Sequence, residues 1–282
     1  MNSEELSELI LNRLQSEADL LRAEFQRPRS VPTRFVTIDN VLPASLAQQI
    51  FEAFPAVTQM RFLSSFRERK YTSKALDKMN PLIEAATFAF QSLEIIQQIE
   101  SITGFRDMEG DPHLYAGGIS TMLEGHFLNP HIDNSHDSEQ QLYRVLNLLY
   151  YISPNWCSEN GGNLELWDER VKEQVEIPSL FNRLVIMETH AQAWHSVNRV
   201  KSAGRRCCVS NYYFSPHPPG DSEHFHITSF KARPEQHMRR AITGADTALR
   251  GVLRKVIKPG IGRNDLYKRG EKYEDTKQKI NQ

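Results

Sequence analysis

The hydrophobic positions of the chain change their spacing between its first third and its middle. Over residues 3–26 they recur every three to four residues, which predicts an amphipathic helix that Ser3 can cap. Similar signals predict helices over 43–54 and 80–104, and a β-branched, aromatic run at 34–38 predicts a strand. The first third of the chain is therefore expected to be mostly helical.

From about residue 112 the pattern becomes that of short strands. Runs rich in Val, Ile, Tyr, Trp and Leu alternate with clusters of Gly, Asn, Pro and Ser, as in an all-β sandwich or barrel. Eight strands are predicted, at 114–123, 128–133, 143–152, 163–167, 173–177, 183–188, 193–199 and 205–214. This order indicates a mainly β protein with flanking helices, built on a double-stranded β-helix (jelly roll, cupin-like) core.

Composition changes again near residue 216, beyond which the chain is polar. We expect an N-terminal helix within 1–30, one domain at 31–220 and an extension at 221–282, with the jelly-roll core at about 112–215. The polar stretch 62–71 is a candidate lid.

The extension is basic, although the net charge of the whole chain is only −1. Residues 231–282 hold 14 Lys and Arg against 6 Asp and Glu, and the remaining residues hold 20 against 29. A basic tail can bind nucleic acid or anionic lipid, but a solvated surface or packing on the acidic body is more common. We therefore expect no nucleic-acid partner.

The sequence favours a cytoplasmic protein. No run of 18 apolar residues predicts a membrane span, and the start, Met-Asn-Ser-Glu-Glu, lacks the basic and apolar regions of a signal peptide. Cys157, Cys207 and Cys208 are a poor disulfide framework, since the adjacent pair would point to opposite faces of a strand. The helix at 3–26 either packs on the core or forms a homodimer contact, and both alternatives stay open.

Candidate metal ligands lie in two of the predicted strands. His131 and Asp133 are two residues apart, so an extended backbone presents both side chains on one face. His195, in a later strand, can complete a 2-His-1-carboxylate set, which leaves one side of a metal open for O2 and a chelating ligand. Any one of these residues alone would more often have a structural role.

The strand at 205–214 carries a candidate anion site. Arg206 and Ser210 share one face of this strand, and Arg205 lies on the other. A guanidinium fork beside a hydroxyl suits a buried carboxylate, so we expect Arg206 to face the interior and Arg205 to face outward.

Five motifs follow one another along the chain, namely His131-Ile-Asp133, Tyr150-Tyr151, Gly161-Gly162, His195-Ser-Val197 and Gly204-Arg-Arg206. In this order they resemble the Fe(II)/2-oxoglutarate-dependent oxygenases, specifically their prolyl 4-hydroxylase-like branch. The similarity covers about residues 112–215.

The resemblance implies a role for each matching residue. His131, Asp133 and His195 would bind iron, Arg206 and Tyr151 would hold the distal carboxylate of 2-oxoglutarate, and Leu164 would line its pocket. Family members often have a Tyr about ten residues before the first iron-binding His, but this chain has Thr121 and Met122 there.

The activity implied is hydroxylation of an aliphatic C–H bond, with 2-oxoglutarate and O2 consumed and succinate and CO2 released. We expect a small-molecule or carrier-linked substrate, and a prolyl residue of a protein is the alternative. Two other classes remain open at this stage: a non-catalytic jelly-roll protein that binds a small molecule, and a hydrolase with Zn2+ on the same three ligands.

Overall fold

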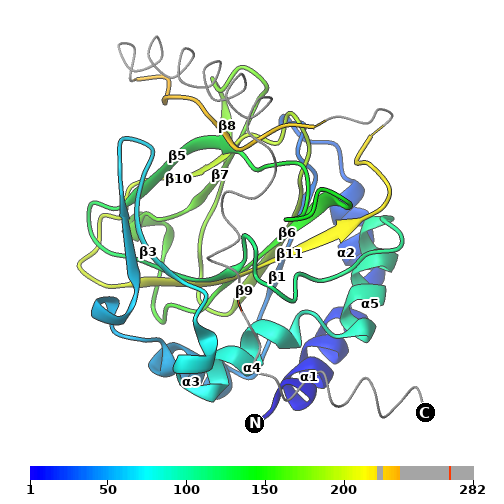
Figure 1. Cartoon of the computed structure of the whole chain (residues 1–282), viewed down its shortest axis with the longest axis vertical. Coiled ribbons are helices and arrows are strands. Elements are labelled where there is room, and N and C mark those ends of the chain that lie inside the picture. Colours follow the sequence, from blue (N-terminus) through cyan, green and yellow to red (C-terminus); the bar gives the residue numbers. More distant parts are fainter. Residues whose placement is uncertain (221–224, 236–266, 268–282) are drawn as a thin grey trace.

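The computed structural model describes residues 1–220, 225–235 and 267 (Figure 1). Its α-helices are α1 (Ser3–Ser16), α2 (Ala18–Gln26), α3 (Ala44–Ala53), α4 (Pro81–Ala89) and α5 (Leu93–Thr103). The helix predicted at 3–26 is thus interrupted at Glu17, and the one predicted at 80–104 is also two helices. Single 3-10 turns lie at Val57–Gln59, Leu76–Lys78 and Ser158–Asn160.

The strands include all eight that were predicted. In chain order they are β1 (Phe35–Asp39), β2 (Arg61–Ser64), β3 (Glu68–Ser73), β4 (Gly118–Met122), β5 (Phe127–Ile132), β6 (Tyr143–Tyr151), β7 (Leu164–Trp167), β8 (Gln174–Ile177), β9 (Arg183–Glu188), β10 (His195–Val197), β11 (Arg206–Ser215) and β12 (Ser229–Phe230). Sequence analysis missed the β2–β3 hairpin, which occupies the stretch proposed as a lid, and the short β12.

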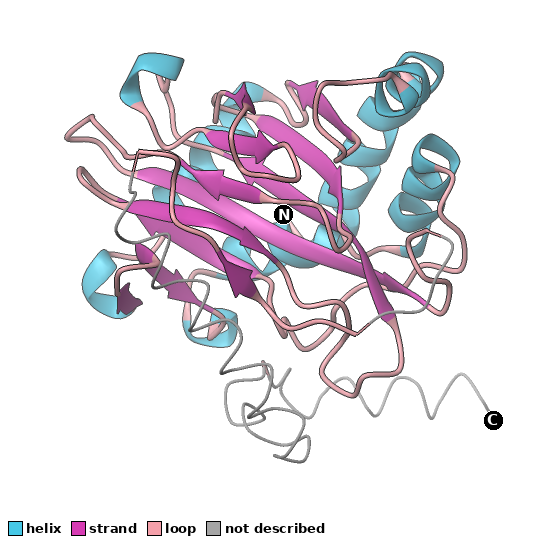
Figure 2. Ribbon diagram, turned by 90° about the horizontal axis from the view of Figure 1, so that it is seen from above, coloured by secondary structure: helices cyan, strands magenta, loops and turns pink. Residues whose placement is uncertain are grey.

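The strands form an antiparallel jelly roll (Figure 2). One side has the strand order β1-β9-β6-β11-β4, the other has the order β5-β10-β7-β8, and β3 bonds to both β4 and β5. β2 extends β3, and β12 pairs with β5. The predicted jelly-roll fold class is confirmed.

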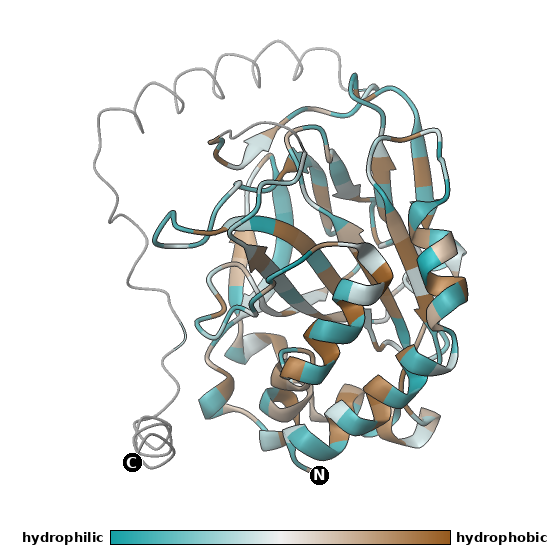
Figure 3. Ribbon diagram, turned by 90° about the vertical axis from the view of Figure 1, so that its right-hand side faces the viewer, coloured by the Kyte–Doolittle hydropathy of each residue, from teal (hydrophilic) through white to brown (hydrophobic). Residues whose placement is uncertain are grey.

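The helices cover the outer face of the larger side (Figure 3). The side chains of β6 alternate between two apolar clusters. Leu148 and Tyr150 pack with helix residues in the main core, whereas Leu149 and Tyr151 pack inside the roll. Burying each such apolar side chain stabilises the fold by about 1.5–3 kcal/mol. A strand buried on both faces explains why 143–152 is nearly all apolar in sequence.

The three cysteines are free, as predicted. Cys207 packs in the main core and Cys208 inside the roll, so the neighbours point to opposite faces of β11. No helix among the described residues is long and apolar enough to cross a membrane. Most of the basic extension, including a helix expected at 246–257, lies outside the described residues.

Candidate active site

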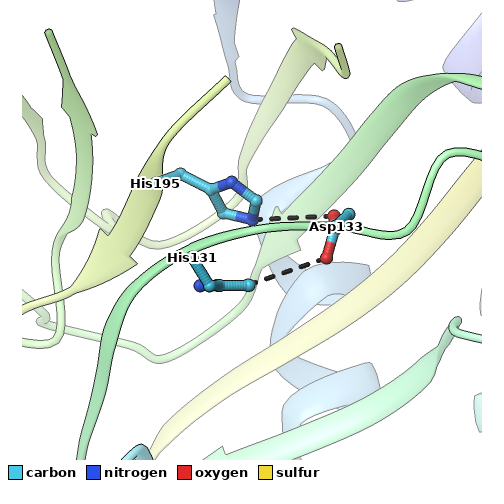
Figure 4. A group of neighbouring side chains, drawn as sticks. All are labelled: His131, Asp133 and His195. Atoms are coloured by element: carbon cyan, nitrogen blue, oxygen red, sulfur yellow. Dashed lines mark ion pairs between the residues drawn. The ribbon is translucent and has the colours of Figure 1, made fainter. Parts of the chain in front are cut away.

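The fold brings His131, Asp133 and His195 together (Figure 4). β5 and β10 are antiparallel neighbours, and their register places His131 directly opposite His195, with ring centroids 4.1 Å apart. Asp133 follows the last residue of β5. One oxygen of Asp133 lies 3.6 Å from Nε2 of His131, and the other lies 3.6 Å from Nε2 of His195.

Hydrogen bonds set the orientation of both imidazoles. Nδ1 of His131 lies 3.0 Å from the carbonyl oxygen of Asn129, and Nδ1 of His195 lies 2.9 Å from that of Ala193. Because a carbonyl only accepts, each Nδ1 carries the proton and each Nε2 turns a lone pair toward Asp133. Burial, with the nearby His195, lowers the pKa of His131 to about 3, so this imidazole stays neutral.

The carboxylate of Asp133 is kept ionised. Burial alone would raise its pKa, but electrostatic interactions with the nearby His195 and Arg144 outweigh that effect and lower it to about 2. Its Oδ2 atom is buried and makes no hydrogen bond, and the 3.6 Å separations are too long for hydrogen bonds to the imidazoles. Three buried ligand atoms with free lone pairs, all within 4.8 Å of one another, fit a divalent metal ion.

A cavity of about 420 Å³ opens beside these residues. Its wall includes Arg206, Ser210 and Leu164 as well as all three candidate ligands. Arg205 points the other way, donating to the carbonyls of Phe51 and Phe54 beneath the helices. The alternation of β11 thus places these two arginines as the sequence predicted.

Arg206 is held in place by the turn at Gly161 and Gly162. Its Nε donates to the carbonyl of Gly162 over 2.9 Å, and the side chain is only 3% exposed. Both glycines have positive φ, and a Cβ on Gly162 would lie 3.3 Å from Cγ of Arg206. The Gly-Gly motif therefore lets the arginine pass close to the backbone and orients its guanidinium.

Tyr151 lies behind this guanidinium rather than on the cavity wall. The Arg206 Cζ atom is 4.6 Å from the centre of the Tyr151 ring, and the phenolic proton has no acceptor. Burial raises the pKa of Tyr151. At the position where related proteins often carry a Tyr, Met122 lines the cavity, and Thr121 contacts Cys207 instead.

Sequence analysis missed several cavity residues. Arg144 of β6 lies 3.7 Å from Oδ2 of Asp133, and Tyr212 of β11 contacts the same carboxylate. Phe230 of β12 stacks on His131, with ring centroids 5.2 Å apart. A charged residue inside an apolar strand was the available signal for Arg144, whereas nothing in the sequence marked β12.

Comparison with known proteins identifies the domain. Residues 117–214 match the family model described as the 2OG-Fe(II) oxygenase superfamily. Over this part of the chain, which runs from β4 into β11, the protein resembles that superfamily. It is accordingly a 2-oxoglutarate-dependent dioxygenase, whose family uses Fe(II), 2-oxoglutarate and O2, and the binding-protein and zinc-hydrolase alternatives are set aside. Among curated proteins, no sequence matches the chain.

Solved structures with a similar fold include prolyl 4-hydroxylases. The enzyme from Pseudomonas putida superposes with a TM-score of 0.51 at 14% identity, covering 72% of this chain and 98% of that one. A prolyl 4-hydroxylase from Phytophthora capsici gives 0.51 at 19% identity, covering 74% of this chain and 65% of that one. The prolyl hydroxylase of Trichoplax adhaerens, solved with a hypoxia-inducible-factor peptide, gives 0.48 at 18%, covering 76% and 90%.

Proposed function

We propose that His131, Asp133 and His195 hold the Fe(II) ion of this oxygenase. The observation that carries the proposal is the convergence of two imidazole Nε2 atoms and one unpaired carboxylate oxygen at the edge of a cavity. Two strands set the imidazoles, and backbone carbonyls set their tautomers, so the site is organised without the metal.

We further propose that Arg206 binds the distal carboxylate of 2-oxoglutarate. Its Nε donates to Gly162 and Nη1 makes a weak contact with the sulfur of Met122, so N–H groups of both terminal nitrogens are left for a paired contact with the carboxylate. Ser210 can donate its hydroxyl from the same face of β11, Leu164 covers the carbon chain, and Tyr151 can reach the carboxylate if the guanidinium shifts.

The bound Fe(II), 2-oxoglutarate and O2 supply the oxidising chemistry that converts a C–H bond to C–OH and releases succinate and CO2. The roles of the chain are binding and orientation. Asp133 and the histidines would hold the metal, Arg206 would align the cosubstrate, and the buried wall would keep the site poor in water.

We propose that the substrate is a small or carrier-linked molecule with an aliphatic carbon to hydroxylate. A cavity of about 420 Å³ suits 2-oxoglutarate together with a small second ligand, and the β2–β3 hairpin and Phe230 narrow it. A prolyl residue of a protein is the second candidate, because the fold is that of prolyl 4-hydroxylases.

The proposal is tested by anaerobic titration of the protein with Fe(II) and 2-oxoglutarate, following the weak visible metal-to-ligand charge-transfer band. The band should form in the wild type and be lost in Asp133→Ala. Asp137→Ala is the matched control, because this nearby carboxylate accepts from the backbone amides of Gln141 and Leu142 instead. If the wild type binds both Fe(II) and 2-oxoglutarate but shows no band, the proposal is refuted.

A further inference from the structure

Arg144 is buried at the cavity with donors that have no partner. Its side chain is 1% exposed, and neither Nε nor Nη2 makes a hydrogen bond. Within the described part of the chain its one nearby carboxylate is Asp133, at 3.7 Å, and its guanidinium lies 4.2 Å from the ring centre of Tyr212. Such donors usually find an acceptor when buried, so this group is incomplete.

A β-bulge turns Arg144 into the cavity. β6 and β11 pair Leu146 with Tyr213 but Arg144 with Phe214, so one extra residue, Val145, lies between the two pairs. Val145 and Leu146 both pack in the core under the helices, and Arg144 therefore faces the opposite side. Bulges commonly re-aim a side chain beside an active site.

Among the described residues, the positive charge of Arg144 is offset only by Asp133 at 3.7 Å. Asp133 is a proposed metal ligand, and its single charge would be shared with the ion. Asp111 acts on Arg144 only from a distance, and burial raises the pKa of that carboxyl. The charged residues that line the cavity are mostly cationic, namely Arg61, Lys70, Lys74, Arg144 and Arg206 against Glu68 and Asp133.

Asn147, on the same strand, presents an unpaired acceptor. The phenol of Tyr212 lies between Asn147 and Asp133. The oxygen of Tyr212 accepts from Nδ2 of Asn147 over 3.2 Å, which leaves the buried Oδ1 of Asn147 without a hydrogen bond. A fixed positive donor and a fixed neutral acceptor thus line one cavity.

We propose that the substrate is an amino acid or N-acylated amino acid, whose carboxylate binds Arg144 and whose N–H donates to Asn147. The inference rests on the proposed iron and 2-oxoglutarate sites and names the substrate class for them. A carboxylate carries one negative charge and accepts two parallel bonds from a guanidinium, which matches the unpaired edge of Arg144. The small adjoining cavity has room for about one water, which cannot neutralise the charge.

The test uses L-amino acids, free and N-acetylated, each with its matching amide. Each compound is added anaerobically to protein loaded with Fe(II) and 2-oxoglutarate, and perturbation of the charge-transfer band is titrated. At least one acid should bind at least about 30-fold more tightly than its amide, because the amide leaves the guanidinium unpaired. Arg144→Met should abolish the preference, and Arg199→Met, which removes an exposed arginine, should keep it.

The remaining outcomes refute either the proposed substrate class or the proposed function. If no acid perturbs the band, if acid and amide bind equally, or if Arg144→Met keeps the preference, the substrate class is wrong. A wild type that forms no band with both ligands bound instead refutes the proposed function.

A second measurement separates binding from a structural role. In the Zn(II)-loaded, substrate-free protein, Arg144→Met should have a Tm equal to or above that of the wild type, because a buried charge whose Nε and Nη2 make no hydrogen bond is replaced by an apolar chain. A Tm many degrees lower would make Arg144 a structural partner of Asp133 and overturn the inference.

Discussion

Replacing Arg206 by Met should weaken 2-oxoglutarate binding while leaving the iron site intact. Arg206 is 3% exposed at the cavity wall, and Gly162 occupies only its Nε. Two hydrogen bonds to a charged carboxylate contribute about 1.5–3 kcal/mol each. Their loss corresponds to about a 10²- to 10⁴-fold rise in the Kd of 2-oxoglutarate.

Arg205→Met is the matched control for this change. The two arginines are adjacent in sequence, but Arg205 donates to the carbonyls of Phe51 and Phe54 on the far side of β11. The Arg205→Met substitution leaves these two carbonyls unpaired and should therefore reduce the free energy of unfolding by about 1–3 kcal/mol. It should leave the Kd of 2-oxoglutarate unchanged.

The assay is anaerobic titration of the Fe(II)-loaded proteins with 2-oxoglutarate, by calorimetry and by the charge-transfer band, with iron content measured separately. A Kd for Arg206→Met within threefold of the wild type would refute the reasoning. So would an equal loss in Arg205→Met, since that would point to damage to β11 rather than to a specific contact.

Two further outcomes follow from buried charges. His131 has a pKa of about 3 in the fold against about 6.5 when unfolded, so below pH 6.5 the unfolded chain binds a proton that the folded chain does not. The metal-free protein should thus lose stability as the pH falls from about 6.5 toward 3, at up to about 1.4 kcal/mol per pH unit. In urea unfolding, the free energy of unfolding of His131→Gln should fall less steeply with pH, by that amount. Equal slopes in the wild type and the variant would contradict the assignment. Arg233→Met removes the partner of the buried Glu165, with which it makes bonds of 3.0 and 2.6 Å, and should cost about 3–5 kcal/mol in urea unfolding. The double variant with Glu165→Met should recover most of that loss, and a double variant no more stable than the single one would show that the pair is not coupled.

The parts of the site that follow from strand alternation could be predicted. Arg206 and Ser210 face the cavity and Arg205 faces the helices because β11 alternates regularly at that end. The predicted strands for His131 and His195 are real, and their antiparallel pairing brings the imidazoles together. Local pattern carries this information because side-chain direction in a regular strand has a period of two.

The parts that depend on irregular pairing could not be predicted. Alternation along β6 would put Arg144 on the same face as Leu146, under the helices, but the bulge at Val145 reverses its direction. The contact between Phe230 and His131 joins segments almost a hundred residues apart through a two-residue strand. A sequence pattern contains neither register nor long-range partners, so both features required the structure.

Different elements of the chain supply the proposed iron and 2-oxoglutarate contacts and the remaining walls of the cavity. Most of the proposed iron and 2-oxoglutarate contacts come from β5, β10 and β11, where His131 pairs with His195 and both imidazoles and Arg206 are buried. The remaining walls come from the β2–β3 hairpin, the bulged end of β6 and the segment around Phe230. Because none of these elements carries a proposed metal ligand, substitutions there can change the substrate while the metal geometry persists. Substrate selection and the oxidising chemistry can therefore vary independently, since only the residues proposed to hold iron and 2-oxoglutarate are tied to the reaction.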